Sequence, residues 1–181
     1  ITTGQLQAAS ARSGRLDVDT AYQHIRVFPA THQASGRPIR VLMTDPFGVQ
    51  SAIFLDTDNP ADLVADYAKF FHLFKHFSPR AETILLIGGA GYTIPGDLLL
   101  RFPSLTLDVV EIDPMMTDMA KKYFALETIA DDPRLKIIHD DGRRFLATNQ
   151  KKYDAIFLDA FQSVLSLPYQ LTTREAVTQM R

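Results

Sequence analysis

Residues 81–113 constrain the fold of this 181-residue chain more than any other segment, because they combine two apolar strands with a glycine-rich turn. Residues 83–87 are a short apolar run typical of a buried parallel strand, and the run ends at Gly88-Gly89-Ala90-Gly91. A second apolar run, residues 105–110, follows a helical stretch and ends on Glu111, about twenty residues after the glycines. Glycines let the backbone pass close to a ligand, and an acid at this spacing can bind both hydroxyls of a ribose. The pattern predicts one half of a nucleoside-binding β-α-β unit.

The glycine loop departs from the dinucleotide-binding fingerprint. The pattern G-x-G-x-x-G needs a third glycine for close packing of the helix on the strand, and Ile94 stands at that position. NAD is therefore the less favoured ligand. An alternative stays open, in which the glycines only form a tight strand-to-helix turn and Glu111 is a solvated strand end.

Two more apolar runs end close to acids. Residues 135–138 lead into Asp140 and Asp141, and residues 153–158 are followed by Asp159. In an open parallel sheet, ligands bind in the crevice outside the carboxyl ends of the strands. Four successive strands would thus bring the glycines and three acids to one edge of the sheet.

Helix capping is a second explanation for some of these acids. Asp113 is followed by a proline, which is typical of an N-cap before the first helical position. Asp140 or Asp141 could cap the helix predicted to begin near residue 143. Capping does not explain Glu111 or Asp159, because neither is followed directly by a helix start.

Five motifs in this order resemble the polyamine aminopropyltransferases, the spermidine synthase family. They extend over most of the chain and read AYQHIRV, GGAGYTIPG, VVEID, DDG and YDAIFLDAF. The set is most similar to divergent spermidine-synthase-like proteins, in which the glycine loop continues into Tyr-x-x-Pro and the last strand is followed by Asp-Ala-Phe. The resemblance implies the α/β fold of class I S-adenosylmethionine-dependent methyltransferases, a Rossmann-like, mostly parallel, doubly wound sheet.

The resemblance also implies roles for individual residues. Glu111 would bind the ribose, Ile112 would contact the adenine face, and Asp141 would accept a hydrogen bond from the adenine amino group. The full set of expected cofactor-binding residues is Gln23, Gly88, Gly89, Gly91, Glu111, Ile112 and Asp141. Asp159 would be the catalytic carboxylate, and the residues expected beside the amine substrate are Tyr67 and Gln162. No metal is expected.

Two acids of the family pattern are absent from this chain. Gly91 stands where spermidine synthases carry an aspartate in the glycine loop, and Gln162 replaces the second aspartate of their catalytic segment. The cationic arm of decarboxylated S-adenosylmethionine and the ammonium groups of a diamine both need carboxylates. Aminopropyl transfer to an amine is the leading hypothesis. Methyl transfer from S-adenosylmethionine and a non-catalytic nucleoside-binding or assembly module are the alternatives.

The region before the glycine loop is organised differently. We expect residues 1–60 to form a small antiparallel sheet and residues 61–181 to form the nucleoside-binding domain with its leading helix. Short β-type runs separated by turn sequences lie at residues 22–28, 39–44 and 51–55. A helix is predicted from Asn59-Pro60 onward, with an apolar stripe of Leu63, Tyr67, Phe70, Phe74 and Phe77, so that Tyr67 could equally be a core residue. His72 and His76 are four residues apart, but no third metal ligand is evident.

Composition narrows the remaining function classes. The formal net charge of −2 gives no basic footprint for nucleic acid, and no apolar run is long enough to span a membrane. The chain has no cysteine, which excludes disulfides and thiolate metal sites. The absence of cysteine is compatible with a cytoplasmic location, and we expect a homo-oligomer, namely a dimer. The resemblance implies S-adenosylmethionine or its decarboxylated form as the donor and a small amine as the acceptor.

The last part of the sequence predicts a helix start and an exposed sheet edge. Residues 172–175, Thr-Thr-Arg-Glu, have the capping-box pattern of a helix start. The fold that the chain resembles continues with further strands, so the sheet is expected to be truncated at its C-terminal end. The apolar run at residues 153–158 would then be an uncovered edge that favours self-association.

Overall fold

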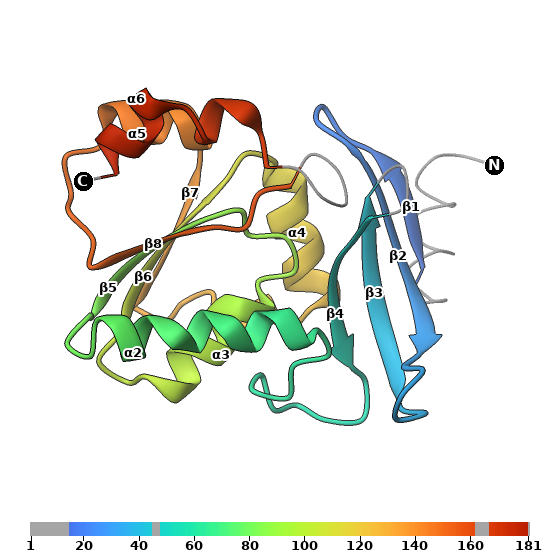
Figure 1. Cartoon of the computed structure of the whole chain (residues 1–181). Coiled ribbons are helices and arrows are strands. Elements are labelled where there is room, and N and C mark those ends of the chain that lie inside the picture. Colours follow the sequence, from blue (N-terminus) through green and yellow to red (C-terminus); the bar gives the residue numbers. More distant parts are fainter. Residues whose placement is uncertain (1–14, 45–47, 162–166, 181) are drawn as a thin grey trace.

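The computed structural model describes residues 15–44, 48–161 and 167–180, which form two sheets that follow one another along the chain (Figure 1). The first sheet is antiparallel and meanders through β1 (Leu16–Asp19), β2 (His24–Thr31), β3 (Pro38–Thr44) and β4 (Gly48–Phe54) in that order. The predicted antiparallel region is thus confirmed. Strand β1 was not predicted: its sequence Leu-Asp-Val-Asp alternates apolar and charged residues, but over four residues only, the shortest run that indicates a strand.

The second sheet is parallel and contains β5 (Thr83–Ile87), β6 (Thr106–Glu111), β7 (Leu135–His139) and β8 (Ala155–Leu158). Its strand order is β7-β6-β5-β8, so the first strand of the sheet lies inside it and the chain changes direction across β5. In such sheets, the crevice for a ligand forms at the carboxyl ends of the strands beside this switch point. The predicted doubly wound α/β class is confirmed.

Helices cover both faces of the parallel sheet (Figure 1). One face carries α5 (Gly142–Thr148), the 3-10 helix η3 (Tyr169–Leu171) and α6 (Arg174–Gln179). The opposite face carries the 3-10 helix η1 (Asp66–Leu73), α2 (Phe74–Phe77), α3 (Thr93–Arg101), α4 (Pro114–Tyr123) and the short η2 (Leu126–Thr128). Side chains alternate along β5. Leu85 and Ile87 pack on the face that carries α5 and η3, and Ile84 and Leu86 pack on the face that carries α3 and α4.

The helix predicted from Asn59-Pro60 is wrong in its start and in its type. It begins at Asp66, and its first eight residues are a 3-10 helix. Three residues complete a 3-10 turn, so side chains spaced for an α-helix do not stay on one face. Of the predicted stripe, Leu63 and Phe74 are buried, whereas the exposed fractions of Tyr67, Phe70 and Phe77 are 47%, 67% and 81%.

Helix starts are set by the side chains that the sequence indicated. The Asp113 carboxylate accepts a hydrogen bond from Met115 N in the first turn of α4, with proline at the first helical position. Asp141 likewise accepts from Arg144 N at the start of α5. The capping box predicted for α6 is shifted by one residue, because the N-cap is Thr173.

Strand β8 is an edge of the parallel sheet in the described part of the chain. Aromatic rings of η1 and α2 pack on it, with the Phe71 ring 4.9 Å and the Phe74 ring 5.8 Å from the ring of Phe157. Among the described strands, β8 thus pairs with β5 only and occupies the expected edge position. Self-association through it, the homo-oligomeric state and the domain boundary after residue 60 stay predictions.

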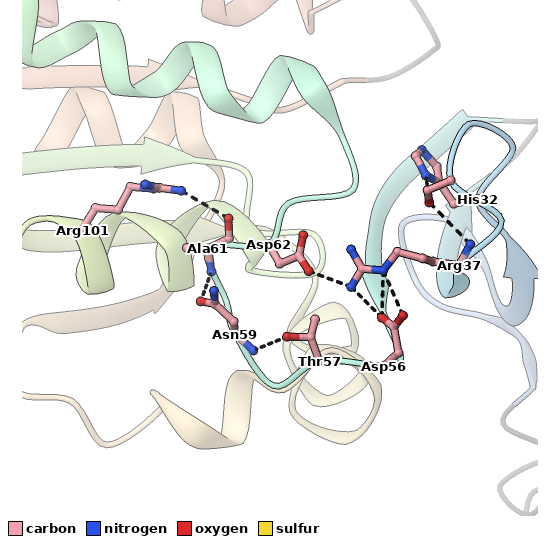
Figure 2. A network of polar contacts seen from close by, with 9 residues as sticks. His32, Arg37, Asp56, Thr57, Asn59, Ala61, Asp62 and Arg101 are labelled. Atoms are coloured by element: carbon pink, nitrogen blue, oxygen red, sulfur yellow. Dashed lines mark hydrogen bonds and ion pairs between the residues drawn. The ribbon is translucent and has the colours of Figure 1, made fainter.

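Polar contacts connect the antiparallel sheet to the segment that leads into η1 (Figure 2). The Arg37 guanidinium, between β2 and β3, donates to both oxygens of Asp56 and, at 2.7 Å, to Asp62. Further along the same segment, the carbonyl of Ala61 accepts from Arg101 of α3 at 3.3 Å. The first part of the connection between the two sheets is thus attached both to the antiparallel sheet and to α3.

Candidate functional site

A cleft of about 510 Å³ opens at the carboxyl ends of β5, β6 and β8, between the parallel sheet and the start of the antiparallel sheet. The predicted site residues that line it are Gln23, Gly88, Glu111, Ile112, Asp141 and Asp159. Within the described ranges, Tyr67, Gly89 and Gly91 do not line the cleft itself. Gln162, expected beside the substrate, lies outside the described residues.

Gly88 forms the floor of the cleft through a close approach of two backbone segments. Its φ is +101°, and a Cβ atom there would lie 2.5 Å from the backbone oxygen of Asp159. Asp159 N donates to the Ile87 carbonyl at 2.8 Å, which continues the pairing of β5 with β8 and places the two residues side by side. Only glycine fits this position. The sequence pattern predicted the glycine for the approach of a ligand, whereas here it is required by the backbone of Asp159.

Glu111 is buried at the end of β6 and accepts three backbone hydrogen bonds. One oxygen accepts from Gly89 N at 2.8 Å and from Ala90 N at 3.2 Å, and the other accepts from Asp113 N at 3.0 Å. The carboxylate therefore holds the glycine loop, in which Ala90 has a positive φ of 44°. A carboxylate has about four acceptor positions, so one is left for a hydroxyl group in the cleft.

Gly91 faces the antiparallel sheet instead of the cleft. Its N–H donates to the Ser51 hydroxyl at 3.0 Å, and a Cβ atom on Gly91 would lie 2.6 Å from the Ser51 Cβ on β4. The expected contact of Gly91 with the cofactor stays a prediction. The glycine is explained by the packing of the loop on β4, which no local pattern in the sequence reveals.

Tyr67 and Asp159 interact at the end of β8. Their expected roles, a substrate residue and a catalytic carboxylate, stay predictions. The Tyr67 hydroxyl lies near the Asp159 carboxylate, and each group shifts the pKa of the other. Burial raises the pKa of Asp159 to about 7, and the hydrogen bond from Tyr67 opposes this shift. Although the Tyr67 side chain is about half exposed, partial burial and the neighbouring carboxylate raise its pKa above the usual range. Asp159 is thus a carboxyl group that can accept a proton near neutral pH.

The turn between β1 and β2 is attached to the N-cap of α4. The Thr20 hydroxyl donates to Asp113 at 2.7 Å and accepts from the backbone N–H groups of Tyr22 and Gln23. The Gln23 amide lies 3.5 Å from the same Asp113 oxygen. Gln23 is therefore held at the mouth of the cleft by a buried carboxylate that also caps a helix.

Several lining residues were missed by sequence reasoning. From the antiparallel sheet and its turn come Tyr22, His24, Thr44 and Gln50, and from the segment after β8 come Phe161, Pro168, Gln170 and Leu171. Tyr22, His24 and Phe161 lie within the motifs AYQHIRV and YDAIFLDAF, but no role was expected for them. The other residues come from chain segments far apart in the sequence, which no motif connects. Among the described residues, the Gln170 Oε1 atom is buried and has no hydrogen-bond partner.

Metal ligands and membrane spans were searched for in the same described ranges. No group of three or more His, Asp or Glu side chains there could hold a metal ion. No helix in residues 15–44, 48–161 and 167–180 is long and apolar enough to cross a membrane. The cytoplasmic location and the absence of nucleic acid stay predictions.

Comparisons with known proteins agree with this architecture. The family model of the spermine/spermidine synthase domain matches residues 67–180. A probable polyamine aminopropyl transferase of Bifidobacterium longum (strain NCC 2705) is 31% identical over 145 residues, which are 75% of this chain and 28% of that protein.

Solved structures show the same fold at lower identity. A probable spermidine synthase from Corynebacterium glutamicum ATCC 13032 has a TM-score of 0.72 at 20% identity, over 91% of this chain and 58% of that one. A spermidine synthase in complex with the transition state analogue AdoDATO has a TM-score of 0.64 at 19% identity, over 91% of this chain and 52% of that one. The chain thus covers less than two thirds of the length of each of these relatives. Because the family model matches more than half of the chain, the protein belongs to the spermine/spermidine synthase family.

Proposed function

We propose that this chain carries the nucleoside site and the catalytic carboxylate of an aminopropyltransferase. The enzyme would transfer the aminopropyl group of decarboxylated S-adenosylmethionine to a small amine. The observation that carries the proposal is the Tyr67–Asp159 pair, which lies against the backbone of Gly88 at the switch point of the sheet. The name of the Bifidobacterium longum relative, a probable polyamine aminopropyl transferase, supports the same reaction.

The lining of the cleft fits an S-adenosyl-type nucleoside. Glu111 retains an acceptor position for a ribose hydroxyl, and the half-exposed Ile112 offers an apolar surface for a purine ring. Only one oxygen of Asp141 is used in capping α5, so the other could accept from an exocyclic amino group. The unpartnered Gln170 Oε1 is a further acceptor on the wall of this cleft.

The reaction would form one bond and break one at the carbon next to the sulfonium. The amine lone pair forms the new C–N bond, the C–S bond breaks with its electron pair going to sulfur, and methylthioadenosine leaves. An alkylammonium group has a pKa near 10, so a base must take a proton from the amine. Asp159, with a pKa of about 7, is a stronger base than an ordinary carboxylate, and Tyr67 orients it. The remaining requirement is alignment of the amine and the carbon.

Methyl transfer from S-adenosylmethionine is the second candidate function. Gly91 stands where the loop acid of the family would bind a cationic donor arm, and its Cβ direction points to Ser51. The glycine loop therefore brings no carboxylate to the tail of the donor, although an aminopropyl ammonium would need one. A tail that carries its own carboxylate has no such need.

Calorimetric titration separates these functions. The protein is titrated with methylthioadenosine, S-adenosylmethionine and decarboxylated S-adenosylmethionine, and release of methylthioadenosine is measured with amine acceptors. Tight binding of the first and third ligands, together with release, supports aminopropyl transfer. Preference for S-adenosylmethionine contradicts it in favour of methyl transfer, and no binding of any nucleoside favours a non-catalytic module. Asp159→Asn is the matched variant, which should bind the nucleosides and lose the release.

A further inference from the structure

The 3-10 helix η1, which carries Tyr67, cannot fix its own position. Runs of 3-10 helix rarely exceed three or four residues because their hydrogen-bond geometry is poor. This one extends over eight residues, Asp66–Leu73, and its N-cap residue Ala65 makes no side-chain capping bond. Its place in the fold must therefore come from contacts with neighbouring elements.

The first of these contacts is a buried carboxylate on the helix after the glycine loop. Asp97 of α3 is 1% exposed, and its two oxygens have different partners. One accepts from Arg101 Nε at 2.6 Å, and the other is hydrogen-bonded to Nε2 of His72 in the last turn of η1. A buried ionised carboxylate needs hydrogen-bond partners, so losing one is costly and the bond to His72 is held firmly.

Arg101 extends this cluster to the segment that precedes η1. Its second nitrogen donates to the carbonyl of Ala61 at 3.3 Å (Figure 2). The cluster around Asp97 thus attaches the segment before η1 and the last turn of η1 to α3. Helix α3 begins directly after the glycine loop that lines the cleft. Contacts between η1 and α3 therefore fix the position of η1 relative to that loop.

The second contact attaches η1 to the strand that ends in Asp159. The Phe71 ring lies 4.9 Å from the Phe157 ring of β8 and 6.4 Å from the Tyr67 ring. His72 and Phe71 are in the last turn of η1 and Tyr67 is in the first, about 10 Å away at about 2 Å per residue. A displacement of the last turn would therefore move the Tyr67 hydroxyl relative to Asp159.

We propose that His72 is a positioning residue for the amine site: its hydrogen bond to Asp97 holds η1, and η1 holds the Tyr67 hydroxyl on Asp159. This inference rests on the proposed function, since it assigns His72 to the control of the same carboxylate. It also explains why His72 and His76, four residues apart, behave differently. His76 is exposed and contacts the ring of Phe77, whereas His72 contacts a buried acid.

The test measures the ionisation of Asp159 by carboxyl ¹³C NMR on aspartate-labelled protein, with Asp159→Asn to assign the signal. Tyr67→Phe should raise the pKa of Asp159 above the wild-type value of about 7, because it removes the hydrogen bond that lowers the pKa. His72→Leu should raise it in the same direction, and the double variant should show no further increase. His72→Gln should restore the wild-type titration, since an amide N–H can replace Nε2–H, and His76→Leu is the matched control.

Turnover gives the second measurement. The acid limb of the pH–rate profile should move to higher pH in His72→Leu, lowering turnover about three- to tenfold near pH 7, while methylthioadenosine affinity stays unchanged. Phe71→Leu should act in the same direction and serves if His72→Leu does not fold. An unshifted Asp159 signal in a folded His72→Leu protein, or additive effects of His72→Leu and Tyr67→Phe, would overturn the proposal. The NMR result stands whether or not aminopropyl transfer is found, so the two proposals fail separately.

Discussion

The two aspartates at the ends of β8 are expected to make the stability of the fold depend on pH in opposite directions. Asp154, just before the strand, accepts hydrogen bonds from Glu82 N at 2.9 Å and from the N–H and hydroxyl of Thr83, and these bonds lower its pKa to about 2. Asp159, just after the strand, is partly buried at the cleft, and this burial raises its pKa to about 7. The fold thus stabilises the ionised form of Asp154 at one end of β8 and the protonated form of Asp159 at the other.

The pH window follows from the sign of each shift. In the unfolded chain both carboxyl groups titrate near 3.8. Folded protein keeps the Asp159 proton up to about pH 7, so the contribution of Asp159 to stability falls as the pH rises from about 4 to 7. A difference of about three pH units is worth about 4 kcal/mol at most, and water in the cleft reduces it to about 1–3 kcal/mol. Asp154 acts in the opposite sense, since its contribution is present above about pH 4 and is lost as the pH falls toward 2.

Urea unfolding of Asp159→Asn and Asp154→Asn, followed by circular dichroism at about pH 4.5 and pH 8, tests this reasoning. Asparagine is neutral, so Asp159→Asn should be more stable than wild type at pH 8 by about 1–3 kcal/mol, with little difference at pH 4.5. Its turnover should fall by about 10²- to 10⁴-fold. Asp154→Asn should be less stable than wild type at both pH values. If the stability of Asp159→Asn relative to wild type does not increase from pH 4.5 to pH 8, the assigned burial of this carboxyl group is refuted.

Three further variants test how the cleft is assembled. Glu111→Gln turns an amide toward backbone N–H donors, so methylthioadenosine affinity should fall about tenfold or more in calorimetry, and hydrogen exchange of the glycine loop should quicken. Gly91→Ala should destabilise the fold by about 1–3 kcal/mol in urea because its Cβ overlaps Ser51, and Ser51→Gly in the same protein should recover part of the loss. Thr20→Val removes the donor to Asp113, so stability should fall by about 1 kcal/mol and nucleoside affinity should weaken; unchanged values would show that the turn is held by other contacts.

The parallel sheet could be predicted because each of its strands leaves a local signature. The apolar run at residues 83–87 is buried on both faces, and the observed strand Thr83–Ile87 has the predicted bounds. The N-cap role of Asp113 could be read from the proline that follows it. The 3-10 character of η1 left no such signature, because its aromatic residues satisfied an α-helical period equally well.

The sequence predicted where the acids of the site lie, but it did not predict their hydrogen-bond partners. Strand ends place Glu111 and Asp159 at one edge of the sheet whatever their partners are. The three N–H donors to Glu111, the packing of Gly91 on Ser51 and the hydrogen bond from Tyr67 depend on loops that fold back over long sequence separations. These contacts cannot be predicted from the sequence alone, because each depends on how two distant segments are placed relative to each other in the fold.

The raised pKa of Asp159 connects the stability of the fold with the proposed chemistry. A carboxyl group kept in water would titrate near 4 and be a weak base toward an alkylammonium group. Burial at the end of β8 makes Asp159 a stronger base, and the same burial destabilises the folded protein near neutral pH. The bond from Tyr67 limits that destabilisation, so a Tyr67→Phe protein should lose stability above pH 7 relative to wild type and lose less of it below pH 5. Urea unfolding at the two pH values measures this, and a pH-independent loss would mean that Tyr67 stabilises the fold through packing alone.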